Sequence, residues 1–314
     1  MIQLKAHYPH RAITNLDSLS LALGLTVREL IDLSENADKY FFLQKVIDKP
    51  DGTKRETYDV KPELKCIHER IKQSLLKKVV YPPYLHGSLK GKDYISNTKE
   101  HTNKKIIISE DVSNFFPSIS AKVIHETWVG FFGFSNEVAK CLTKLVTHKG
   151  FLVQGAKPSS YLSNLVLWRR ESELVKQLNT EGYTYTRYVD DIAISSSNNM
   201  SKAEITFVIK RIYQMLRTIN VKPNRKKHAV MPCGNRQHVH GVNLNSGKPT
   251  MQKEERDKIK SAVYECENYY VHSSNSAEYN KLFSRVMGRV NNMKRMHLDE
   301  GLKLRKRLSK IKPQ

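Results

Sequence analysis

Tyr188-Val189-Asp190-Asp191 sets two adjacent carboxylates between two runs of residues that favour β-strands. The flanks, Thr184–Arg187 and Ile192–Ser196, contain β-branched and aromatic side chains typical of strands. This pattern predicts a hairpin over residues 183–197 with both aspartates at its tip. Aspartate is also an ordinary turn residue, so this segment alone indicates a turn more strongly than a site.

A third aspartate, Asp111, ends a short apolar run over Lys104–Val112 that predicts a buried strand. An aspartate there is also an ordinary cap for the helix that follows. Phosphoryl transfer, however, needs carboxylates from separate strands, because two divalent ions about 3.5–4 Å apart clamp the attacking and leaving oxygens. Mg²⁺ prefers hard oxygen ligands. Asp111 together with Asp190 and Asp191 therefore indicates a two-metal site.

The chain is strongly basic. Its 314 residues hold 53 Lys plus Arg against 31 Asp plus Glu, a formal net charge of +22. Such a charge predicts a polyanionic partner, and nucleic acid is the first candidate. An anionic membrane surface is the weaker alternative, since no apolar run reaches the roughly 18 residues of a spanning helix.

Four cysteines, Cys66, Cys141, Cys233 and Cys266, are scattered without a CxxC pair. This spacing argues against a zinc site and against a disulfide framework. No charged-then-apolar leader opens the sequence. We therefore expect a reducing, cytoplasmic environment.

The expected elements follow a mixed α+β order with segregated helices at the end. Thr26 and Glu29 form the signature of a capping box within helices at 17–33. A hairpin is expected at 40–58, turning at Lys49-Pro50-Asp51-Gly52. Further helices are expected at 61–78, 121–147, 160–178, 202–219 and from 252 onward, and further strands near 226–231 and 237–244.

Six elements over residues 50–245 occur in the order found in reverse transcriptases. The two aspartate segments, 111–118 and 188–191, resemble palm motifs. The other matching segments are Gly52 to Arg55 with Pro62 to Lys65, Gln154-Gly155-Ala156 with Ser159 and Leu162-Ser163-Asn164, Asn224 to Lys227, and Val239 to Asn243. Agreement in order is far more specific than any single motif.

Two elements, one of which lies within the last of these six, resemble the retron branch of that family. Asn97-Thr98-Lys99-Glu100-His101 is similar to its Asn-Ala-x-x-His element, and Val239-His240-Gly241 to its Val-Thr-Gly element. Each departs at one position, Thr98 and His240. The hairpin tip has Val189 where retron enzymes more often have alanine.

The resemblance implies roles residue by residue. Asp111, Asp190 and Asp191 would be catalytic and, with Val112, would bind two Mg²⁺ ions, which Mn²⁺ could replace. The implied nucleotide-binding residues are Arg55 at the triphosphate, Phe116 under the sugar, Gln154 and Gly155 against nucleotide and template, and Lys227 as general acid for pyrophosphate. Solvated Arg and Lys side chains and a core Phe are the ordinary alternatives.

RNA or DNA contacts are implied at the retron-like elements and expected on the basic C-terminal helices. A solvated helical face is the usual alternative for such charge runs. The expected residues are Asn97, His101, Val239, His240, Gly241, Arg285, Arg289, Lys303, Arg305 and Arg307.

The expected architecture is a right-hand polymerase. Fingers and palm, an antiparallel sheet plus helices, would cover 1–245, with N-terminal helices at 1–40, and a helical thumb would cover 246–314. The resemblance implies an RNA-directed DNA polymerase that uses dNTPs and copies a structured non-coding RNA, both template and primer, into single-stranded DNA linked to that RNA. It also implies anti-phage defence with a separate effector protein.

Three alternatives stay open. The first is a protein-primed or untemplated defence polymerase, or an enzyme of the group II intron type. The second is an RNA-binding scaffold for an effector protein, against which the intact aspartates argue. The third, a DNA-binding regulator using residues 19–31, leaves the downstream motifs unexplained.

Overall fold

The computed structural model describes residues 3–49, 52–274 and 276–313. It divides into two compact units: unit 1 is formed by residues 1–97 and 106–230, and unit 2 by residues 98–105 and 231–314. The division into fingers with palm and thumb at residue 245 remains a prediction, because the two units are defined by compactness and not by function.

Unit 1 begins with two short helices, α1 (Leu16–Leu23) and α2 (Val27–Glu35). The expected capping box is confirmed: the Thr26 hydroxyl accepts from the Glu29 backbone, and the Glu29 carboxylate accepts from the Thr26 backbone.

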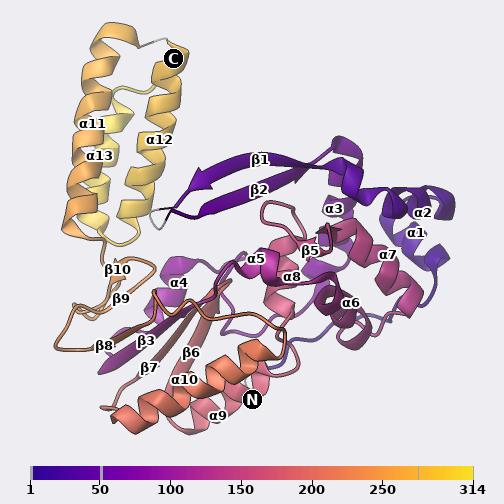
Figure 1. Cartoon of the computed structure of the whole chain (residues 1–314). Coiled ribbons are helices and arrows are strands. Elements are labelled where there is room, and N and C mark those ends of the chain that lie inside the picture. Colours follow the sequence, from indigo (N-terminus) through magenta and orange to yellow (C-terminus); the bar gives the residue numbers. More distant parts are fainter. Residues whose placement is uncertain (1–2, 50–51, 275, 314) are drawn as a thin grey trace. The chain divides into compact units, whose positions relative to one another are not determined.

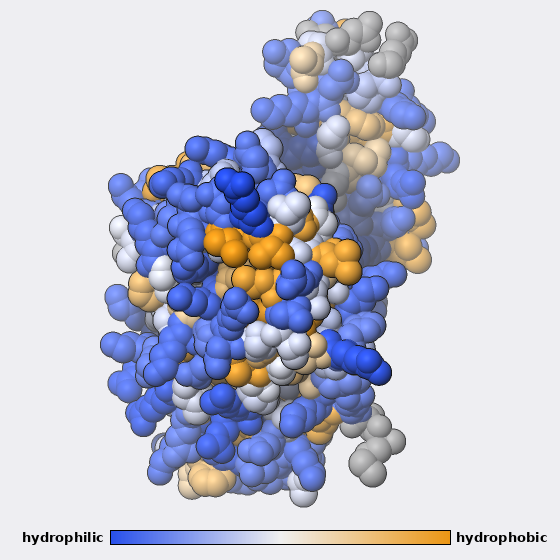
Figure 2. Space-filling view, turned by 90° about the vertical axis from the view of Figure 1, so that its right-hand side faces the viewer, coloured by the Kyte–Doolittle hydropathy of each residue, from blue (hydrophilic) through white to orange (hydrophobic). Residues whose placement is uncertain are grey.

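Leu21 is 84% exposed. Figure 2 looks onto this side of unit 1 and shows a hydrophobic patch within a mostly hydrophilic surface. The two helices carry four acidic residues and a single basic one, Arg28, so the DNA-binding alternative gains no support here.

The hairpin expected at 40–58 is confirmed as β1 (Phe41–Asp48) paired with β2 (Lys54–Val60), with a bulge between Leu43 and Lys45. Its expected turn residues Pro50 and Asp51 lie outside the described residues. The 3-10 turn η1 (Ala37–Tyr40) precedes it, and α3 (Pro62–Ser74), η2 (Leu76–Lys78) and α4 (Tyr94–Lys99) follow.

A four-stranded sheet in the order β6-β7-β3-β8 forms the centre of unit 1 (Figure 1). The hairpin of β6 (Tyr183–Tyr188) and β7 (Asp191–Ser196) and the buried strand β3 (Ile106–Asp111) confirm the expected strands. β8 (Ala229–Pro232) leads out of the unit. The antiparallel register pairs Asp111 with Asp191. The register therefore brings the third aspartate to the hairpin tip.

The single helices expected at 121–147 and 160–178 are wrong, because each is two helices. The first divides into α6 (Ala121–Gly130) and α7 (Asn136–Val146) at Gly133, whose φ of +72° favours glycine and ends a helix, and Ser135 then caps α7. The second divides into α8 (Ser159–Leu165) and α9 (Glu171–Thr180). The remaining elements of unit 1 are α5 (Phe115–Ser118), β4 (Thr147–His148), β5 (Phe151–Leu152) and α10 (Lys202–Arg217).

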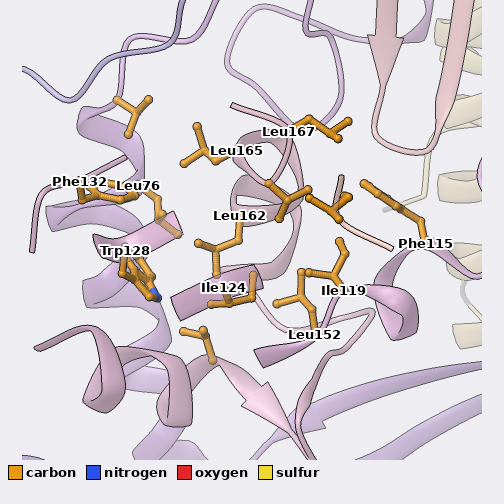
Figure 3. Close-up of a cluster of buried hydrophobic side chains, with 14 of the residues drawn as sticks. Leu76, Phe115, Ile119, Ile124, Trp128, Phe132, Leu152, Leu162, Leu165 and Leu167 are labelled. Carbon is orange, nitrogen blue, oxygen red and sulfur yellow. The ribbon is translucent and has the colours of Figure 1, made fainter. Parts of the chain in front are cut away.

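A hydrophobic core joins these pieces. Figure 3 shows Ile124 and Trp128 of α6, Leu162 of α8 and Leu152 of β5 directed toward one another, and all four are 0% exposed. Phe115 of α5 is also buried, at 3% exposure. The core thus fixes α5 and β5 to the helices beside the sheet.

Unit 2 is mainly a bundle of three helices, α11 (Lys253–Ser273), α12 (Ala277–Lys294) and α13 (Leu298–Ser309), as expected from the C-terminal pattern (Figure 1). Val263, Val290 and Leu308 are 0% exposed in its core. A small hairpin, β9 (His238–Val239) with β10 (Val242–Asn243), precedes the bundle. No helix among the described residues is both long and apolar enough to cross a bilayer.

Candidate active site

The tip of the β6–β7 hairpin is conformationally strained. Val189 has a φ of +59°, a region that β-branched residues rarely adopt. Gly87 lies against the tip so closely that an added Cβ would stand 2.4 Å from Cγ2 of Val189 and 2.7 Å from its nitrogen. Such strain persists only where the surroundings hold it in place.

Arg187 is the residue that holds the tip. Its side chain and that of Glu171 on α9 are 1% and 2% exposed, and Nε lies 2.5 Å from Oε1 while Nη2 lies 2.8 Å from Oε2. Nη1 also donates to the Val189 carbonyl at 3.0 Å. Further donations reach the carbonyls of Ser163 and Asn164 in α8. A buried arginine with these partners ties the strained tip to two helices.

Asp111 faces the hairpin from β3 and is held by one short segment after α10. The Asn224 amide nitrogen Nδ2 donates to Oδ2 at 2.9 Å, and Lys227 Nζ lies 2.8 Å from Oδ1. The Asn224 backbone also donates to the Asp111 carbonyl at 2.7 Å. The hydrogen bond to Asp111 raises the pKa of Lys227, so this ammonium stays charged beside the carboxylate.

The two tip aspartates add to the negative charge beside Asp111. Burial, together with the charges of Asp191 and Asp111, raises the pKa of Asp190 to about 6. The Val112 backbone donates to the Asp190 carbonyl at 3.2 Å. Crowded carboxylate oxygens are the ligands that hard divalent cations prefer, and a cation would relieve their repulsion, so the donor set fits such ions.

The side chains of the three aspartates do not converge on a single point. Among the described residues, no three His, Cys, Asp or Glu side chains stand in a metal-holding group. Both oxygens of Asp111 are instead engaged by Lys227 and Asn224. A metal ion would therefore have to compete with the Lys227 ammonium for Asp111.

The three aspartates line a cavity of about 720 Å³ in unit 1. The cavity also brings in Val112 and four of the five expected nucleotide-binding residues: Arg55, Phe116, Gln154 and Lys227. The fifth, Gly155, has a φ of +112° and packs so tightly that an added Cβ would stand 2.3 Å from the Tyr58 carbonyl. Glycine there lets the Gln154 carbonyl accept from the Tyr58 backbone at 2.8 Å, which joins this loop to β2.

The sequence interpretation missed several cavity residues, among them His148 and Lys149. His148 stacks on Phe41 with ring centroids 5.0 Å apart, and its Nδ1 lies 2.9 Å from Asp38. The Lys149 backbone donates to the same carboxylate at 2.8 Å. These contacts join residues more than a hundred positions apart. The only signal for them in the sequence is a His-Lys pair directly after the helix expected at 121–147.

Three residues of the first retron-like element and one residue of the second are buried. Asn97 is 1% exposed, and its Oδ1 accepts from Thr186 at 3.2 Å. His101 is 0% exposed, Val239 is 4% exposed, and Gly241 is exposed at the turn of the β9–β10 hairpin. Within unit 2, the segment 98–105 is bonded to residues near β9: Gln237 donates to Lys104 and the Cys233 backbone to Lys105.

The expected basic residues of unit 2 fall into two groups. Arg285, Lys303 and Arg305 are exposed. Arg289 pairs with Glu255 at 3.1 Å, and Arg307 forms a two-pronged pair with Glu267 at 2.8 and 2.5 Å. The last two would have to exchange a carboxylate for a phosphate in order to bind nucleic acid.

Comparisons with known proteins show what this chain is similar to. A family model described as "Reverse transcriptase (RNA-dependent DNA polymerase)" matches residues 47–260. The retron Se72 reverse transcriptase of Salmonella heidelberg (strain 579083-10) is 34% identical over 98% of this chain and 82% of its own length. The retron Ec48 reverse transcriptase of Escherichia coli is 30% identical over 96% and 77%. The telomerase of Candida tropicalis, solved in complex with a TWJ fragment of telomeric RNA, is a weaker match, with a TM-score of 0.46 and 12% identity over 86% of this chain and 58% of that one.

The raised pKa of Asp190 predicts pH-dependent metal binding. A metal ligand must be deprotonated. Since this pKa is about 6, Mn²⁺ affinity should be constant above about pH 7 and fall up to about tenfold per unit below pH 6. Isothermal titration calorimetry between pH 5 and pH 8 measures it. Asp190→Asn should flatten the profile, whereas Asp17→Asn, an exposed control on α1, should not. Equal affinities at pH 5 and pH 7 would refute the prediction.

The buried pair predicts a large loss of stability in Arg187→Met. The substitution leaves the Glu171 carboxylate buried without its cation, which costs about 3–5 kcal/mol. The free energy of unfolding in urea measures this cost. The matched control is Arg170→Met, whose pair with Glu173 is 64% and 68% exposed with the charged atoms 3.8 Å apart, and it should change stability little. A variant as stable as the control would contradict the role assigned to Arg187.

Proposed function

The chain belongs to the reverse transcriptase family, and within it to the retron enzymes, and is an RNA-directed DNA polymerase; on this premise we propose that it copies a structured non-coding RNA into single-stranded DNA. This RNA would serve as template and primer, and the product would stay linked to it. The observation that carries the proposal is the meeting of Asp111 with Asp190 and Asp191 on one cavity that also holds Arg55 and Lys227.

The reaction we propose is attack of a primer hydroxyl on the α-phosphorus of a dNTP, with pyrophosphate as the leaving group. Asp111, Val112, Asp190 and Asp191 would hold two Mg²⁺ ions, for which Mn²⁺ could substitute. When bound, such ions neutralise developing charge and favour an ionised primer hydroxyl. The protein's own task is to orient these carboxylates, which the β3–β7 register and the Arg187 contacts support.

The remaining cavity residues would bind the nucleotide. Arg55 on β2 offers a cation to the triphosphate, and Lys227 would give a proton to the leaving pyrophosphate. Phe116 is half-buried at the cavity, whereas its neighbour Phe115 belongs to the core. A ring at Phe116 would clash with a 2′-hydroxyl and so select deoxynucleotides. Gln154 and Gly155 would contact nucleotide and template.

Nucleic acid would be bound by the basic helices and the retron-like elements. The exposed Arg285, Lys303 and Arg305 would meet backbone phosphates directly, and Arg289 and Arg307 would do so after leaving their carboxylates. A second set of residues, most of which are buried, would recognise the cognate RNA through the shape of the segments in which they lie. This set consists of Asn97, His101, Val239, His240 and Gly241.

We further propose that the enzyme works in the cytoplasm and takes part in anti-phage defence together with a separate effector protein. Retron membership supports the defence role. The four cysteines are all free, which suits a reducing compartment.

Nucleic acid extracted from the expressed protein tests the proposed product. The protein would be produced with its native genomic flank and compared with the double variant Asp190→Asn/Asp191→Asn on a denaturing gel. We expect a DNase-sensitive species, shifted by RNase, that is absent from the double variant. The exposed substitution Asp17→Asn is the control and should leave the species unchanged.

Two other outcomes would contradict the proposal. Bound RNA without DNA in any sample would point to an RNA-binding scaffold. DNA without attached RNA would point to a protein-primed or untemplated enzyme.

A further inference from the structure

Strand β3 ends in two adjacent acidic residues with different surroundings. Asp111 lines the cavity, while Glu110 is 0% exposed and does not line it. Successive side chains of a strand point to opposite faces of the sheet, so Glu110 lies on the face away from the cavity. None of the roles described above uses this second carboxylate.

Glu110 is satisfied by two different segments. Its Oε1 lies 2.7 Å from Nδ1 of His228, and its Oε2 accepts from the hydroxyl of Tyr213 on α10 at 3.2 Å. A carboxylate without access to water needs such partners, because an unsatisfied buried acceptor is costly. Each partner is therefore fixed in place relative to β3.

The segment that contains His228 is the same one that holds Asp111. Lys222 accepts from the Ser113 backbone at 2.9 Å, Asn224 and Lys227 bond to Asp111, and His228 bonds to Glu110. Neighbouring residues 227 and 228 thus bond to neighbouring residues 111 and 110. One short segment of chain therefore forms hydrogen bonds to the end of β3 on both faces of the strand.

The position of Lys227 depends on these hydrogen bonds because its own side chain is long and 59% exposed. A flexible ammonium keeps one position only if the backbone that carries it does. A hydrogen bond fixes distance and angle, whereas an apolar pair of similar size would anchor the segment without burying a carboxylate. The Glu110–His228 contact therefore suits orientation better than it suits stability alone.

We propose that Glu110 and His228 are a positioning pair that holds the backbone at Lys227 so that its ammonium stays at the cavity that Asp111 also lines. The inference rests on the proposed role of Lys227 as the proton donor to pyrophosphate. His228 does not touch the reacting atoms and acts through Lys227.

Steady-state addition of dTTP to poly(rA)·oligo(dT) separates this role from a merely structural one. We expect His228→Leu to lower kcat about tenfold, a part of what general acid catalysis contributes, with KM for dTTP within about twofold of wild type. His228→Asn should restore most of kcat, because its amide nitrogen takes the place of Nδ1. Tyr213→Phe is the matched control: it also removes one partner of Glu110 and should lower the melting temperature, but it should leave kcat near wild type.

A double-mutant cycle tests the route through Lys227. Lys227→Leu should lower kcat about a hundredfold, and adding His228→Leu should lower it no further. Effects that multiply in the double variant would overturn the inference, as would a loss of kcat in Tyr213→Phe equal to that in His228→Leu.

A further outcome distinguishes this inference from the proposed function. If Lys227→Leu retains wild-type kcat while Asp190→Asn is inactive, the acid role of Lys227 is wrong and the positioning pair falls with it. The polymerase function would then still stand.

Discussion

The guanidinium of Arg187 lies inside unit 1 without access to water, and this burial constrains the tip of the β6–β7 hairpin. A charge in such a place must be paired and hydrogen-bonded. Glu171 supplies the pairing charge, and backbone carbonyls of α8 and of Val189 take the remaining donors. The hydrogen bonds that satisfy the buried arginine therefore also fix the orientation of the hairpin tip. Without that fixed orientation, the strained backbone at Val189 would relax, and the register between Asp111 and Asp191 would no longer bring their carboxylates together.

Around the tip, positive charge in the cavity offsets the negative charge of the three aspartates. Burial, together with repulsion from Asp191 and Asp111, raises the pKa of Asp190. Lys227 and Asn224 offset it at Asp111. On the proposed function, metal ions and a triphosphate would exchange with these internal partners, and the same residues would then act on the nucleotide. The opposite face of β3 contributes through Glu110 and His228, which connect the orientation of Lys227 to the body of the sheet.

Local patterns carried much of the prediction. β-Branched and aromatic residues and a short apolar run predicted the strands, the Thr26–Glu29 spacing predicted a cap, and motif order predicted that Asp111 would meet the hairpin. Pairs that join distant segments could not be predicted, because Arg187 with Glu171 and Glu110 with His228 look like ordinary surface charges until the fold buries them. The breaks within two expected helices depend on short turns that apolar periodicity does not register. The burial of Asn97 and His101 likewise arises from packing that a motif does not encode.

The proposed two-metal site is formed by the three aspartates on β3 and the hairpin. It is tested most directly by anomalous X-ray scattering from crystals of the protein with a primer–template, a non-hydrolysable dTTP analogue and Mn²⁺. We expect two manganese peaks in contact with Asp111 and Asp190, with the Lys227 ammonium displaced from Asp111. Peaks only elsewhere, or Lys227 still bonded to Asp111 with no manganese beside the aspartates, would contradict it.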